Sequence, residues 1–152
     1  MANYKRMFLD GYSYFITVVT HNREPILIEN INILRDSFRE SKRYYKYDIE
    51  AICVLPDHFH MIIVPFDVKD YPNIIKSIKY NFTSKYKINN DVSQSFSRHK
   101  KKMQPVWQKR YYEHTIRSQK DLYEKMKYIK NNPIKHGLVN VWNEWEYSSF
   151  MF

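Results

Sequence analysis

Two histidines one residue apart, His58 and His60, stand in the short apolar segment 55–64. The composition of this segment is that of a strand, in which side chains two positions apart project from the same face. Two imidazoles on one face of a strand can share a divalent metal ion. The same pair could instead be hydrogen-bonded or solvated at a strand end, because a metal site usually needs a third protein ligand.

A second group of candidate residues lies in the helix that the sequence predicts at 118–132. Tyr128 and Asn132 stand at positions i and i+4, and therefore on one face of that helix. An amide oxygen suits Mg²⁺ or Mn²⁺, and a tyrosine beside it could attack an electrophile that the metal polarises. Asn131 and Glu124 lie on nearly the same face, so spacing alone does not single out Asn132. Among 14 tyrosines, a half-buried structural role for Tyr128 is the ordinary alternative.

The pattern of apolar residues predicts the elements that must hold these side chains. Segments rich in β-branched and aromatic residues are typical of strands, and apolar residues three or four apart are typical of helices. The predicted order is a strand at 14–20, a helix at 31–45, a strand at 48–55, a tight turn at Pro56-Asp57, the histidine strand, a helix at 73–86, a strand at 111–117 and the helix at 118–132. We expect Ser118 to cap this last helix in a variant capping box with Asp121, and Asn132-Pro133 to end it.

This order predicts an α+β fold. Strand, helix, strand, strand, helix, strand is the ferredoxin-like sequence of elements, with two helices on one face of a four-stranded antiparallel sheet. The histidine strand carries apolar residues on both faces, for example Ile62 on the histidine face and Phe59 on the other, so both faces should be covered. We therefore expect the helix at 118–132 to lie over the histidine face. Without repeats or a linker, residues 1–152 are predicted to form a single domain.

The composition favours a nucleic-acid partner. The chain of 152 residues has a formal net charge of +9 and a pI near 9.5, which favours binding to a polyanion, although basic proteins without that role exist. Its 2 glycines form no Gly-rich phosphate loop. The single Cys53 cannot build a disulfide framework, and no segment approaches the length of a membrane span. We therefore expect a cytoplasmic protein with no membrane partner.

Several segments together resemble a known family in their order and spacing. They are 14–17, 20–23, 55–60, Trp107-Gln108, Ile116-Arg117, 128–139 and 142–150, which span nearly the whole chain. The chain resembles the REP-associated tyrosine transposases, within the HUH superfamily of single-strand DNA nickases and transposases. The resemblance implies that His58 and His60 bind a divalent metal ion, Mg²⁺ or Mn²⁺, that Asn132 completes the metal site and that Tyr128 is the nucleophile.

The resemblance also implies a reaction and a partner. The reaction is metal-dependent nicking and strand transfer of single-stranded DNA through a covalent 5′-phosphotyrosine intermediate, and the partner is single-stranded DNA with a hairpin. A homodimer is a further expectation. The sequence does not name the base that deprotonates Tyr128, and Tyr111 and Tyr112 on the predicted fourth strand are its rivals as nucleophile. This chain is rich in Lys, Tyr and Asn where many relatives favour Arg, which leaves the DNA target open.

Basic residues supply the expected contacts with DNA. The candidates are Arg98, Lys100, Lys101, Lys102, Lys109, Arg110, Arg117 and Lys135, with a solvated surface as the ordinary alternative. A different function for the whole chain would be a non-catalytic nucleic-acid-binding domain on a ferredoxin-like sheet, where exposed aromatic residues stack on bases. The absence of an RNP1-like pattern from the sequence disfavours that alternative.

Overall fold

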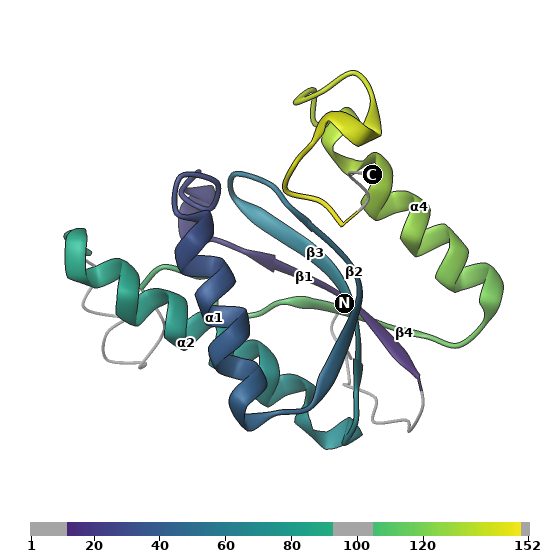
Figure 1. The fold of residues 1–152 in the computed structure, drawn as a ribbon, viewed down its shortest axis with the longest axis horizontal. Helices are drawn as coiled ribbons and strands as arrows, with labels where there is room; N and C mark the ends of the chain where they lie inside the picture. The colour runs from purple at the N-terminus through teal and green to yellow at the C-terminus, as the bar shows by residue number, and fades with distance from the viewer. Residues whose placement is uncertain (1–11, 93–104, 150–152) are drawn as a thin grey trace.

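The computed structural model describes residues 12–92 and 105–149. Within these ranges, four antiparallel strands form one sheet in the order β2-β3-β1-β4 (Figure 1). The strands are β1 (Ser13–Val19), β2 (Tyr47–Val54), β3 (His58–Pro65) and β4 (Tyr112–Ile116). One long helix follows β1 and another follows β3, and β1 and β3 are the central strands. This arrangement is the predicted ferredoxin-like α+β fold.

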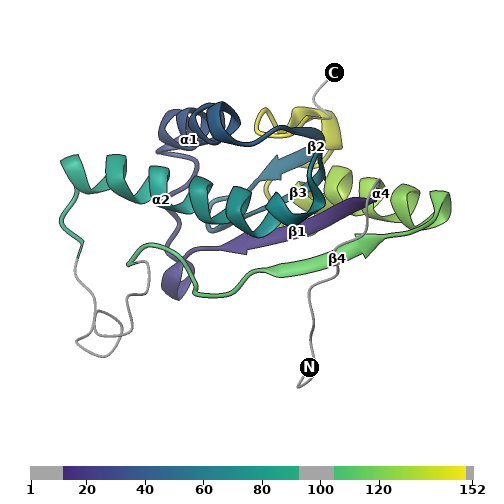
Figure 2. The same ribbon diagram turned by 90° about the horizontal axis from the view of Figure 1, so that it is seen from below.

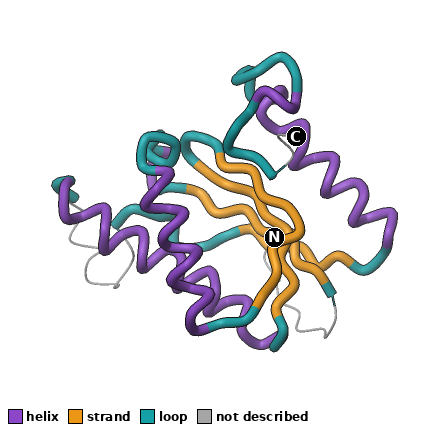
Figure 3. Tube along the Cα trace, in the orientation of Figure 1, coloured by secondary structure: helices purple, strands orange, loops and turns teal. Residues whose placement is uncertain are grey.

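Helices cover both faces of the sheet. α1 (Ile31–Tyr44) and α2 (Tyr71–Asn89) lie on one face, and α4 (Gln119–Lys135) lies on the other (Figures 1 and 2). In the tube of Figure 3 the four strands run between these two layers. Three short 3-10 helices complete the described elements: η1 (His21–Arg23), η2 (Val68–Asp70) and η3 (Trp142–Glu144). The single domain over residues 1–152 stays a prediction, because both ends of the chain lie outside the described residues.

The two faces of β3 pack in separate apolar clusters, as its alternating pattern predicts. Phe59, together with Met61 and Ile63, belongs to the larger cluster under α1 and α2. Ile62 points to the opposite face and packs in a smaller cluster with Ile129 of α4. All of these side chains are fully buried. Because β3 is central and covered on both sides, its side chains are held in place from both directions.

Strand register places four side chains in one row across the sheet. His60 of β3 pairs with Cys53 of β2 on one side and with Thr17 of β1 on the other. Thr17 in turn pairs with Tyr112 of β4. Side chains directly opposite each other on neighbouring strands share a face. We call these four residues, Cys53, His60, Thr17 and Tyr112, the His60 row.

The predicted end of the last helix is wrong by one turn. Pro133 lies inside α4, which continues to Lys135. The helix ends in a Schellman motif, because Gly137 has a φ of +71° and its N–H donates to Ile134 O, while Leu138 N donates to Pro133 O. The glycine, and not the proline, therefore ends the helix. Ser118 caps the other end as predicted by accepting a hydrogen bond from Asp121 N at 3.1 Å, but the reciprocal half of the capping box is wrong, because the Asp121 carboxylate is bound to His114 and Lys125 instead.

The segment after η3 pairs with the C-terminal part of the free edge of β2. Val54 N donates to Tyr147 O at 2.8 Å, and Ser149 N donates to Ile52 O at 2.9 Å. Trp145 Nε1 donates to Val54 O at 2.8 Å. The backbone groups of Ile52 and Val54, which would otherwise be open to another chain, are thus paired. No helix within residues 12–92 and 105–149 combines the length and hydrophobicity needed to cross a bilayer.

Candidate functional site

The two histidines of β3 lie together on the face that α4 covers. Their ring centroids are 4.8 Å apart and the rings are nearly perpendicular, at 82°. Both residues are buried, with exposed fractions of 5% for His58 and 4% for His60. Their backbone is part of the central strand of the sheet, so the pair is rigidly held.

Each imidazole is oriented through its Nδ1 atom. His58 Nδ1 lies 2.6 Å from Asp57 Oδ1, and His60 Nδ1 lies 2.7 Å from Thr17 Oγ1. An ionised carboxylate can only accept, so His58 Nδ1 donates, and the lone pair of its Nε2 is left for another partner. A proton on His60 Nδ1 would have the same effect through Thr17. Such oriented imidazoles are typical of metal ligands. Neither supporting residue was predicted from the sequence, although Asp57 directly precedes His58.

Asn132 comes close to His60 from α4. Its side chain is fully buried next to the His60 ring, but the two side chains are not joined by a hydrogen bond. Among the described residues, neither polar atom of the Asn132 amide has a hydrogen-bond partner, and His60 Nε2 has none either. Buried polar atoms without partners are costly. A cation that accepted lone pairs from both side chains would satisfy His60 Nε2 and the amide oxygen.

The rotation of α4 about its axis separates Asn132 from the neighbours that spacing could not exclude. Asn131 is half-buried and lines a different cleft, which α4 forms with Trp142. Glu124 is exposed and lines the same cavity as Tyr128. Among the described residues, no group of three or more His, Cys, Asp and Glu side chains could hold a metal ion.

Tyr128 lies beside the imidazoles. Its ring centroid is 5.3 Å from that of His60 and 5.9 Å from that of Phe15, both in perpendicular contacts. The residue is 39% exposed, and Lys135 Nζ lies 5.0 Å from the centre of its ring. Lys135 can reach this position because α4 continues through Pro133. The rival Tyr111 packs against the cluster on the opposite face of the sheet. Tyr112 remains in the same cavity as Tyr128.

Burial and neighbouring charge set the ionisation of the site. Burial, followed by the charges of His58 and His136, lowers the pKa of His60 to about 3. His60 is therefore neutral at physiological pH, which is the form that binds metal ions. Burial raises the pKa of Asp57, but hydrogen bonds from His58 and Arg23 outweigh it and hold that pKa below its usual value. The Arg23–Asp57 ion pair measures 3.2 Å.

A cavity of about 610 Å³ opens between α4 and the sheet. Its lining comprises Phe15, Thr17, Arg23, His58, His60, Tyr112, Glu124, Lys125, Tyr128, Lys135 and His136. Three of these side chains are cations, so the cavity favours an anion such as a phosphate group. A hydroxyl nucleophile beside two imidazoles and an amide is suited to group transfer at such a phosphate.

His136 was not among the predicted site residues. Its ring centroid lies 5.2 Å from that of His58, at the C-terminal end of α4. Burial, then the positive charges of His58 and Lys135, lower its pKa. The signal that could have found it is Gly137, which marks the end of the helix one residue later.

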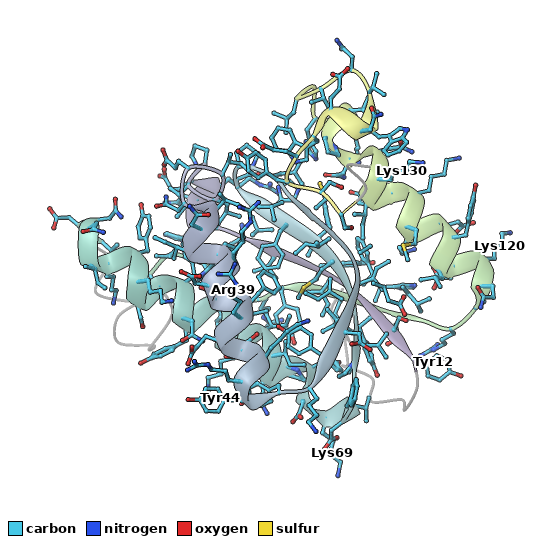
Figure 4. All side chains as sticks on the ribbon, viewed as in Figure 1. Tyr12, Arg39, Tyr44, Lys69, Lys120 and Lys130 are labelled. Carbon is cyan, nitrogen blue, oxygen red and sulfur yellow. The ribbon has the colours of Figure 1, made fainter. Side chains whose placement is uncertain are left out.

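The predicted DNA-binding residues have different locations. Lys135 lines the cavity. Lys109, Arg110 and Arg117 are exposed next to β4, outside the lining of the cavity. Arg98, Lys100, Lys101 and Lys102 lie outside the described residues. Two lysines of α4 that were not among these predictions, Lys120 and Lys130, are labelled in Figure 4.

Comparison with known proteins supplies relatives for this chain. The family profile described as "Transposase IS200 like" matches residues 9–132. A "Putative REP-associated tyrosine transposase" of Haemophilus influenzae is 36% identical over 154 residues, covering 99% of this chain and 86% of the relative. A REP-associated tyrosine transposase of Escherichia coli K12 is 32% identical over 152 residues, covering 99% and 83%. A solved REP-associated tyrosine transposase bound to a REP hairpin superimposes with a TM-score of 0.80 at 31% identity, covering 99% and 84%.

Proposed function

Because the chain belongs to the IS200-like transposases, and within them to the REP-associated tyrosine transposases, we propose that it nicks and joins single-stranded DNA next to a hairpin. By family it is a DNA transposase. The proposed intermediate is a 5′-phosphotyrosine on Tyr128. The relative solved with a REP hairpin supports hairpin DNA as the partner. A homodimer and a location in the cytoplasm, where chromosomal DNA lies, belong to the same proposal.

One observation carries the proposal above the others. Tyr128 stands with its ring 5.3 Å from His60, next to three buried polar atoms that have no hydrogen-bond partner among the described residues. A merely structural tyrosine would give no reason for the neighbouring His60 and Asn132 to stay unsatisfied. A catalytic tyrosine beside a metal site accounts for both features.

We propose that His58, His60 and Asn132 hold Mg²⁺ or Mn²⁺. The two neutral imidazoles and the amide carry no charge, so a divalent cation bound there keeps its full charge and supplies Lewis acidity toward a phosphate oxygen. Asp57 and Thr17 keep the imidazoles oriented for that role. Imidazole ligands favour Mn²⁺ over Mg²⁺ in affinity.

The side chains of the cavity would then perform a transesterification. Tyr128 Oη forms a bond to phosphorus while the bond to the 3′-oxygen breaks, and the phenolic proton leaves as the 3′-oxygen gains one. Arg23 and Lys135 line the cavity and would place positive charge around the phosphate. Attack by a 3′-hydroxyl of another strand reverses the step. Because the phosphodiester is stored as a covalent bond to tyrosine, joining needs no nucleotide cofactor.

The test is a search for the covalent adduct. Labelled single-stranded DNA carrying a hairpin is incubated with the protein and MnCl₂, and the mixture is separated under denaturing conditions. We expect a labelled protein band for the native chain and none for Tyr128→Phe. The matched control is Tyr123→Phe, a tyrosine on the same helix that is 69% exposed and lines the other cleft.

Two outcomes would contradict the proposal. A peptide map that places the adduct on Tyr112, the other tyrosine of the cavity, would overturn the nucleophile while keeping the reaction. Binding of hairpin DNA with no adduct under any metal condition would favour the non-catalytic nucleic-acid-binding domain.

A further inference from the structure

Tyr112 presents an exposed aromatic ring to the cavity. The residue is 53% exposed although it lies on a strand of the sheet. Its ring contact among the described residues is a perpendicular one with Phe15, at 73° and 6.1 Å between centroids. A large ring that faces a cationic cavity without a stacked neighbour offers a platform on which an unpaired base can stack.

The His60 row fixes how far this platform is from the proposed reaction. Tyr112 on β4 and His60 on β3 flank Thr17 on β1, all in one row and on one face. Neighbouring strands lie about 4.8 Å apart, so the two residues are separated by roughly 10 Å. A short stretch of single strand bridges that distance. A base close to a phosphate held beside His60 and Tyr128 can therefore reach Tyr112.

Glu124 lies in the same cavity and does not suit a phosphate. It stands one turn before Tyr128 on α4, and of the described residues that line the cavity it alone carries a carboxylate. Its neighbour Lys125 is bonded to Asp121 at 3.0 Å. A carboxylate repels the phosphates that the cations of the cavity attract. It can, however, accept a hydrogen bond from the exocyclic amino group of a base, as Glu and Asp do from cytosine N4.

We propose that Tyr112 and Glu124 form a base-binding subsite for a cytosine near the scissile phosphate, with the ring stacked on Tyr112 and its amino group donating to Glu124. The identification of that phosphate as scissile rests on the proposed function, whereas the binding itself does not. The subsite requires single-stranded DNA, because in a duplex the amino group is already paired and the faces of the base are already stacked.

The test compares two probes whose bases differ in the group at C4 and in the proton on N3. Fluorescently labelled octamers of deoxycytidine and deoxyuridine carry an amino group and a carbonyl, respectively, at C4. Their binding to the full chain is measured by anisotropy in EDTA, so that no cleavage intervenes. We expect the native chain to prefer the deoxycytidine octamer by at least about five-fold. We expect Tyr112→Leu to weaken the binding of both probes roughly ten-fold, and Tyr112→Phe to retain it.

Glu124→Gln isolates the recognition of the amino group. The amide keeps an acceptor and gains a donor, so we expect the preference for deoxycytidine to fall to about one. A purely electrostatic role of Glu124 would tighten the binding of both probes equally and leave the ratio unchanged. The control Tyr123→Leu removes an exposed tyrosine of α4 outside the cavity and should match the native chain.

Two results would overturn the subsite. One is an effect of Tyr112→Leu no larger than that of Tyr123→Leu, and the other is an unchanged ratio in Glu124→Gln. The adduct assay on the native chain decides the proposed function separately. If the native chain forms the adduct but Glu124→Gln keeps the native preference for deoxycytidine, the subsite alone is rejected. If Glu124→Gln loses that preference but the native chain forms no adduct, the proposed nicking and joining activity alone is rejected.

Discussion

The two faces of the sheet differ in what covers them, although the same strand supplies both. Under α1 and α2, Phe59, Met61 and Ile63 are fully buried within one large apolar cluster. Under α4, Ile62 packs in a smaller cluster, and the same face of β3 carries His58 and His60 beside a cavity of about 610 Å³. α4 therefore covers part of its face with apolar contacts and leaves the rest for polar groups. We call the face under α1 and α2 the closed face and the face under α4 the half-open face. The closed face supplies stability, and the half-open face supplies the candidate chemistry.

The largest effect should come from the half-open face. Replacing His60 by Ala removes a proposed metal ligand, and we expect cleavage of hairpin-bearing single-stranded DNA to be lost while binding of that DNA is mostly kept. The matched control is His114→Ala, because His114 is half-buried on β4 and bonded to Asp121 at 2.7 Å but does not line the cavity. Metal-dependent cleavage that survives in His60→Ala would place the site elsewhere.

On the closed face, the effect should fall on stability instead. Phe59 is fully buried and contacts Trp107 and Phe38, with ring centroids 6.0 and 5.7 Å away. Phe59→Ala should lower the free energy of unfolding by about 3–5 kcal/mol. Urea unfolding followed by tryptophan fluorescence measures it. Cleavage per folded molecule should stay within about two-fold of the native chain. If Phe59→Ala lost cleavage while its free energy of unfolding was unchanged, the two faces would not differ in the way described.

The contrast between the faces is visible in the sequence, but the details of the half-open face are not. Alternation along β3 is a local property, so the sequence alone assigns Phe59 and His60 to opposite faces. The rotation of α4 about its axis depends on packing against Ile62, and only this packing separates Asn132 from Asn131. Register is equally non-local: nothing near Tyr112 in the sequence indicates that it shares a row with His60.

The end of α4 shows how one misassigned boundary hides site residues. A proline disfavours the helical conformation of the residue before it, and this predicted that the helix would stop at Asn132. In the structure Pro133 is accommodated inside the helix, and the left-handed Gly137 ends it. The additional turn brings Lys135 over the ring of Tyr128 and His136 next to His58. His136 was missed for this reason.

Replacing Asn132 measures how much folding stability the chain loses by burying an amide without hydrogen-bond partners on the face of the sheet under α4. Its amide is fully buried and has no hydrogen-bond partner among the described residues, so Asn132→Leu should raise the metal-free free energy of unfolding by about 1–3 kcal/mol. The native chain should gain thermal stability on addition of Mn²⁺, and the variant should gain much less. Differential scanning fluorimetry with and without the ion measures both. Asn131→Leu is the matched control on the same helix, outside the cavity. A variant less stable than the native chain without metal would mean that the amide is already satisfied.

The smallest effect is a dependence of stability on pH that originates from the half-open face. The pKa of His60 is about 3 in the folded chain, mainly because of burial, whereas an unfolded histidine titrates near 6.5. Between these values the unfolded state binds more protons, so stability should fall as the pH drops below about 6.5, by at most ~1.4 kcal/mol per pH unit for this residue.

His136 has a lowered pKa and contributes with the same sign, but less, because it is exposed. Asp57, whose folded pKa is also lowered, stabilises the fold above its unfolded value near 3.9 and loses that contribution only at lower pH. Burial raises the pKa of Glu113, so this residue contributes with the opposite sign, and only the difference between the native chain and a histidine variant isolates the histidine. Urea unfolding in EDTA at several values of pH should show a slope for the native chain and a flatter one for His60→Gln, with His114→Gln as the control on the same face. Equal slopes in the native chain and His60→Gln would show that burial of His60 does not disfavour its charged form.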